Sequence, residues 1–201
     1  MKKFFIALFA LVLTVSACQK SFAQNADAIV SLEYYRFPNE VGDDDSAKYR
    51  LSLNVGIGGN FLFTDTFGIR AQSSLHIPVL SLLANSVNDD EETDTDFGFG
   101  WSVGVGPVFI IPVGNESKFE ISIQLQNFLA TNYYYNGGSD SFALGGEILY
   151  RTNLSDDLKG FAIGVAYYRI FNEYFFKQEE RYTGFNKGFI IRPEICINLG
   201  F

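Results

Sequence analysis

The feature that most constrains the fold of this chain is a two-residue alternation that recurs in eight segments from residue 28 onward. In each segment apolar side chains, many of them aromatic, take every second position, and glycines or polar residues take the positions between. A period of two is the period of a β-strand, whose successive side chains point to opposite faces. The predicted strands are Ala28–Phe37, Lys48–Phe61, Phe67–Leu80, Phe97–Ile111, Lys118–Leu129, Phe142–Arg151, Gly160–Asn172 and Gly188–Phe201.

The distribution of polar residues separates two all-β folds. In a soluble β-sandwich the apolar face is the inner one, so the glycines and isolated Arg and Glu residues of all eight segments would lie outside. In a membrane barrel the apolar face meets lipid and the polar face lines the interior. Each segment has about ten residues or more, the length that crosses a bilayer at a barrel's tilt. We therefore predict an all-β fold, an antiparallel eight-stranded up-and-down transmembrane β-barrel.

The connections between the predicted strands support this topology, because short and long connections alternate along the chain. The short ones are Leu62–Thr66, Pro112–Ser117 and Thr152–Lys159, and the long ones are Pro38–Ala47, Ser81–Asp96, Ala130–Ser141 and Glu173–Lys187. Outer-membrane barrels have short periplasmic turns and longer extracellular loops. The pattern predicts a bacterial outer-membrane location, with all four long loops extracellular.

The N-terminal segment resembles a secretory signal peptide. Lys2 and Lys3 precede the apolar run Phe4–Val15, which is too short to span a bilayer as a helix. Cleavage after Ala23 would leave residues 24–201 as the barrel domain. The alternative is a lipobox ending at Cys18, in which Cys18 would be acylated.

The last predicted strand carries a family resemblance. It ends as Ile195-Cys196-Ile197-Asn198-Leu199-Gly200-Phe201, and an alternating strand with a terminal aromatic residue is similar to the C-terminal insertion signal of outer-membrane proteins. In pattern and topology, residues Ala28–Phe201 resemble the small eight-stranded outer-membrane barrels, the OmpX-like proteins and the OmpA transmembrane domain. The resemblance implies a monomer with a narrow lumen and a structural or surface-interaction role, and it supplies no catalytic motif.

The lumen of an eight-stranded barrel is just wide enough for its own side chains. Charged residues that point inward must therefore pair, because a lone buried charge is costly. We expect Glu120 to pair with Arg151, and Glu33 with Arg192. The full polar network predicted for the lumen comprises Glu33, Arg50, Arg70, Glu120, Glu147, Arg151, Arg192 and Glu194.

Composition excludes several function classes. A net charge of −8 argues against a nucleic-acid partner. One histidine and two cysteines exclude a multi-histidine metal site and a zinc ribbon, and we expect neither a metal nor a cofactor. The acidic runs Asp43–Asp45 and Asp89–Glu92 lie in long loops, where they are either solvated or able to collect divalent cations through oxygen ligands. These long loops also offer a surface to an extracellular partner.

Three cations mark the extracellular rim of the predicted barrel. Arg36, Arg169 and Lys187 point outward near the ends of strands that become neighbours when the barrel closes. Outward cations at this level can reach anionic lipid headgroups, which suggests contact with outer-membrane lipid, in particular the phosphates of lipopolysaccharide. The alternative is three unrelated interfacial residues.

Two other functions remain as alternatives. Ser74 and His76 share one face of a strand, and a serine beside a base is the minimum of a nucleophilic site, as in a lipid A-modifying enzyme. In the predicted register, however, both face the lumen and no acid lies on the adjacent strands. The third function is a narrow pore for ions or small solutes.

Overall fold

The computed structural model describes residues 26–36, 49–78, 99–133, 137–154, 160–175, 180–184 and 188–199. The expectations about the signal peptide, Cys18, the acidic runs, Lys187 and Phe201 fall outside these residues. The strands are β1 (Ala26–Arg36), β2 (Tyr49–Leu62), β3 (Phe67–Pro78), β4 (Phe99–Val113), β5 (Ser117–Tyr133), β6 (Gly137–Thr152), β7 (Phe161–Phe175), β8 (Glu180–Thr183) and β9 (Phe189–Asn198).

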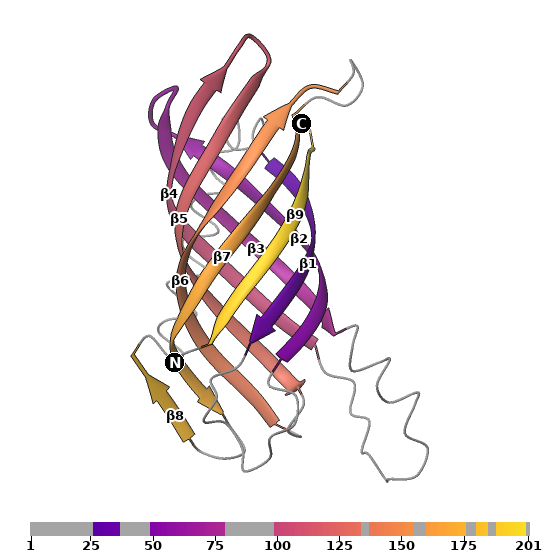
Figure 1. Cartoon of the computed structure of the whole chain (residues 1–201), viewed down its shortest axis with the longest axis vertical. Helices are drawn as coiled ribbons and strands as arrows, with labels where there is room; N and C mark the ends of the chain where they lie inside the picture. Colours follow the sequence, from indigo (N-terminus) through magenta and orange to yellow (C-terminus); the bar gives the residue numbers. More distant parts are fainter. Residues whose placement is uncertain are drawn as a thin grey trace, which may run out of the picture.

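Eight of these strands form a closed barrel (Figure 1). Neighbours along the chain pair from β1 to β7, and β9 closes the ring between β7 and β1. Every pairing is antiparallel. The predicted fold is therefore confirmed. The described part of the chain holds no helix with the length and hydropathy needed to cross a membrane.

The predicted alternation sorts the side chains to the two faces of the wall. On β1, Val30 and Leu32 are 44% and 43% exposed, whereas Ser31 and Glu33 are 3% and 0% exposed. The other barrel strands repeat this pattern, so the side chains buried in the molecule are mostly polar and the exposed ones mostly apolar. This is the reverse of a soluble protein, in which burial of apolar surface drives folding.

Several strand limits differ from the sequence-based expectation. β5 and β6 run to Tyr133 and from Gly137, so most of the loop expected at Ala130–Ser141 is a strand hairpin. The loop expected at Glu173–Lys187 contains the end of β7, which pairs with β8. These extensions are held by hydrogen bonding between neighbouring strands. The sequence of each segment alone does not indicate that it pairs.

β9 contains Pro193, and a proline within a strand is typical of a bulge or an edge because it lacks an N–H. The strand is nevertheless continuous and keeps one register with β1 on both sides of the proline. The ladder skips only the residues around Leu32, as expected where proline lacks an N–H. The register between β5 and β6 shifts between Ala130 and Tyr133, and a bulge lies between β6 and β7, where Phe171 is the extra residue. Because the bulge reverses the alternation, Glu173 turns inward and is fully buried.

Candidate functional site

A buried ion-pair cluster fills the lumen near the short turns. Arg151 Nε lies 2.7 Å from Glu120 Oε1, which is the pair expected from the sequence. Arg151 also donates to both carboxylate oxygens of Asp27, at 2.9 and 2.7 Å. Asp27 was missed because the first strand was expected to begin one residue later. Asp27 lies at the start of a series of alternate positions that continues with Ile29, Ser31 and Glu33. This spacing could have indicated that its side chain points inward.

Arg70 extends this cluster toward the middle of the barrel. Its Nε lies 2.7 Å from Glu147 Oε1, an ion-pair contact without hydrogen-bond geometry. Its Nη1 lies 3.5 Å from Asp27 Oδ2 and 3.9 Å from Glu120 Oε2. Asn60 bridges the two sides, because it accepts from Arg70 and donates to Glu120. Arg70 is fully buried, so it and Arg151 together balance the carboxylates of Asp27, Glu120 and Glu147 in a space closed to solvent.

A tyrosine organises the polar contacts above that cluster. Gln126 donates to the Tyr168 hydroxyl at 2.7 Å, and Gln72 and Arg192 approach the same oxygen at 3.4 Å. Arg192 Nε donates to Glu194 Oε2 at 3.1 Å. The register on either side of Pro193 places Glu33, the partner expected from the sequence, across from Arg192 on the neighbouring strand, and Glu194 is the next inward residue of β9.

His76 lies near the long-connection end and links three strands. Its Nε2 lies 2.7 Å from Ser102 Oγ on β4, and its Nδ1 lies 3.1 Å from Glu33 Oε1 on β1. Both ring nitrogens are therefore engaged, and the serine partner is Ser102 rather than the expected Ser74. The acid at this site comes from β1, beyond the two adjacent strands that the sequence analysis considered, because Glu33 reaches His76 from the far side of β2. Asn54 holds the second oxygen of Glu33 at 3.2 Å.

This Ser–His–Glu arrangement has the connectivity of an activated serine but not the location of a lipid-modifying site. Ser102, His76 and Glu33 are 3%, 1% and 0% exposed, and all three face the lumen. Lipid chains would contact the opposite face of the wall. The geometry favours a structural link between β1, β3 and β4 over acyl chemistry on lipid.

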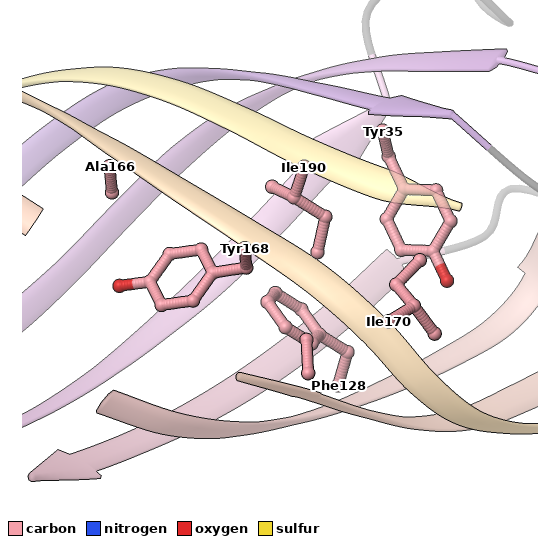
Figure 2. Close-up of a cluster of buried hydrophobic side chains, with 7 residues drawn as sticks. Tyr35, Phe128, Ala166, Tyr168, Ile170 and Ile190 are labelled. Carbon is pink, nitrogen blue, oxygen red and sulfur yellow. The ribbon is translucent and has the colours of Figure 1, made fainter. Parts of the chain in front are cut away.

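An aromatic and aliphatic cluster occupies the lumen beside His76 (Figure 2). Phe128 lies with its ring centroid 5.8 Å from that of His76, and Tyr35, Ile170 and Ile190 gather against it. The Tyr35 hydroxyl donates to Glu173 Oε1 at 2.5 Å and lies 3.3 Å from Ser141 Oγ. Sequence reasoning missed Glu173, because only the bulge in β7 brings it inward.

The described lumen is thus filled along its length, from Asp27 to Glu173, by side chains that bond to one another. Of the polar network expected from the sequence, seven residues lie buried there, while the side chain of Arg50 falls outside the described part.

Because a filled lumen leaves no water column, we expect purified protein to give no stepwise conductance in planar bilayers. Discrete openings in wild-type protein, measured beside a porin as positive control, would contradict this expectation.

The outward face near the long connections carries two of the three predicted rim cations. Arg36 and Arg169 lie in one cross-strand row on either side of Phe189. The Arg36 guanidinium carbon lies 5.8 Å from the centroid of the Phe189 ring. One row toward the short turns, Tyr34 and Tyr167 flank Ile191, and both rings lie 6.0 Å from that of Phe189. Two cations and three aromatic rings therefore meet on β1, β9 and β7.

Comparisons with known proteins identify the fold. No protein-family model matches the sequence, and no curated protein matches it. Neisserial surface protein A (NspA) superposes with a TM-score of 0.55 at 8% identity, covering 88% of this chain and 96% of that one. Ail, the attachment invasion locus protein of Yersinia pestis, gives 0.37 at 13% identity, over 87% and 97% of the two chains. The likeness to NspA shows that the chain has the fold of the small eight-stranded outer-membrane barrels.

Proposed function

We propose that this protein is an outer-membrane barrel with a plugged lumen that presents a rigid sheet for interactions outside the cell. The observation that carries the membrane location is the inverted wall, apolar outside and polar inside. Exposed apolar side chains on every barrel strand would be an aggregation hazard in water, whereas lipid satisfies them. The lumen contributes stability and leaves no path for solutes.

The surface role is supported by a sheet that continues beyond the barrel. We call this the raised sheet and define it by residues 129–133, 137–141, 172–175 and 180–183. Figure 1 shows these ends of β5, β6 and β7, together with β8, reaching further than the ends of β1 and β2. On its side away from β7, β8 has no partner strand among the described residues. A strand edge is the surface to which an extended peptide adds by backbone hydrogen bonds.

The location and orientation can be tested by cysteine labelling in intact cells. Thr183 in the raised sheet and Glu116 in a short turn are both exposed, and the native Cys196 is buried. We expect a membrane-impermeant maleimide to label Thr183→Cys at once, and Glu116→Cys only after the outer membrane is permeabilised. The wild-type protein controls for background. Immediate labelling of Glu116→Cys alone would reverse the orientation, and equal labelling of both would refute the membrane location.

The interaction surface needs a separate test with a defined probe. A phage-displayed peptide library is selected on the folded protein in lipid nanodiscs. Replacing Glu180–Thr183 by Gly-Ser-Gly-Ser keeps the chain length but removes the strand propensity of β8. We expect selected peptides to bind this variant at least about tenfold more weakly, because their strand partner is lost. Gly and Ser at Asn115 and Glu116 make the matched control. Equal binding to all three proteins would refute the role of β8.

A further inference from the structure

We infer that the outward patch formed by Arg36, Phe189 and Arg169 binds a lipid headgroup that carries two phosphates, as lipid A does. The inference rests on the proposed outer-membrane location and names a ligand for that surface. The patch includes the two tyrosines of the next row, Tyr34 and Tyr167, which complete a ring-lined platform.

The charge of this face is the first support. The described outward residues of β1, β9 and β7 include two charged side chains, Arg36 and Arg169, and both are positive. They lie on one level of the wall, in a chain whose net charge is −8. Guanidinium groups bind phosphate oxygens in a bidentate way, which makes arginine well suited to this ligand.

The spacing of the two arginines is the second support. They belong to strands on either side of β9, two strand spacings apart, which corresponds to about 10 Å between their backbones. The Phe189 ring stands between them and packs against the Arg36 guanidinium, the geometry of a cation–π contact. Two separated cations on either side of a ring fit two phosphates on one headgroup better than a single phosphate.

The wall below the patch is the third support, because it matches the acyl part of such a lipid. Beneath the two tyrosines lie Leu32, Pro193 and Val165, followed by Val30, Ile195 and Ile163. All of these side chains except Pro193 belong to the exposed apolar set, with exposures from 41% for Ile195 to 53% for Ile163. A tyrosine row between the arginines and the aliphatic wall is the arrangement expected at the interface of headgroups and acyl chains.

The test compares lipid bound to wild-type protein and to R36Q/R169Q, counted by native mass spectrometry. Nanodiscs contain phosphatidylcholine with lipid A, dephosphorylated lipid A or phosphatidylglycerol. Heat-modifiable migration in detergent gels confirms that each variant is folded. We expect the double substitution to reduce bound lipid A at least about fivefold, since both phosphate contacts are lost. K118Q, a half-buried cation at the short-turn end, should retain lipid A at the wild-type level.

The other lipids and a second variant test whether the two phosphates are the groups that the patch binds. The wild type should bind dephosphorylated lipid A and phosphatidylglycerol weakly, and R36K/R169K should retain more lipid A than R36Q/R169Q because the charge is kept. Wild-type levels of lipid A on R36Q/R169Q, or equal binding of the dephosphorylated form, would overturn the inference. Equal binding of phosphatidylglycerol would overturn the requirement for two phosphates. If Thr183→Cys is labelled from outside while R36Q/R169Q keeps its lipid A, the lipid site alone is refuted.

Discussion

Replacing Arg70 with methionine should lower the free energy of unfolding by about 3–5 kcal/mol. Arg70 is the cation that neutralises Glu147 at 2.7 Å, and it also lies within 4 Å of Asp27 and Glu120. Methionine fills part of the volume but leaves the Glu147 carboxylate buried without that counterion. Urea unfolding in lipid vesicles measures the change, and Trp101, the one tryptophan, reports it from the outer wall by fluorescence.

Two further variants show whether charge or volume is responsible. Adding Glu147→Gln to Arg70→Met should recover more than half of the loss, because the uncompensated carboxylate is removed while Asp27 and Glu120 keep Arg151. Lys118→Met removes a 30% exposed cation at the edge of the cluster and should cost less than about 1 kcal/mol. A loss in Arg70→Met that Glu147→Gln does not relieve would show that packing dominates at this position.

Gly145→Ala should destabilise the barrel by about 2–3 kcal/mol and slow its folding into lipid. Gly145 faces the lumen where β6 approaches β7 closely. A Cβ at this position would lie 2.0 Å from the Tyr167 carbonyl oxygen and 2.5 Å from the Tyr168 Cα. These are backbone atoms, so only a shift of the strand relieves the overlap. Such a shift would move Tyr168, whose hydroxyl accepts hydrogen bonds from Gln126, Gln72 and Arg192.

The next residue supplies a matched control for this substitution. Gly146 lies on the outer side of the same strand, and the nearest atom to a Cβ there is the Ser122 carbonyl oxygen at 3.1 Å. Gly146→Ala should change the free energy of unfolding by less than about 1 kcal/mol, because a small adjustment suffices and the unfolded chain loses entropy. Equal effects at the two positions, in unfolding and in the folded fraction on detergent gels, would contradict a role for close strand approach.

Much of the lumen could be predicted because strand parity is a local property. Glu120 and Arg151 were assigned to one face and one end from their positions in alternating segments, and the structure joins them. The alternation of β4 also places Ser102 inward, but its bond to His76 depends on the register between β3 and β4, which pairs His76 with Gly100. Ser102 lies two residues further along β4, and its Oγ reaches His76 Nε2 at 2.7 Å. Alternation within one strand carries no information about that offset.

The sequence by itself determined that apolar and polar side chains occupy opposite faces of eight strands, because a period of two fixes side-chain direction within each strand. It also determined which end of the barrel has short turns. Only the tertiary structure decided which inward charges meet, that Glu173 enters the lumen through a bulge, and that β8 extends the raised sheet. These features depend on register and closure, which bring together residues more than a hundred positions apart, such as Asp27 and Arg151.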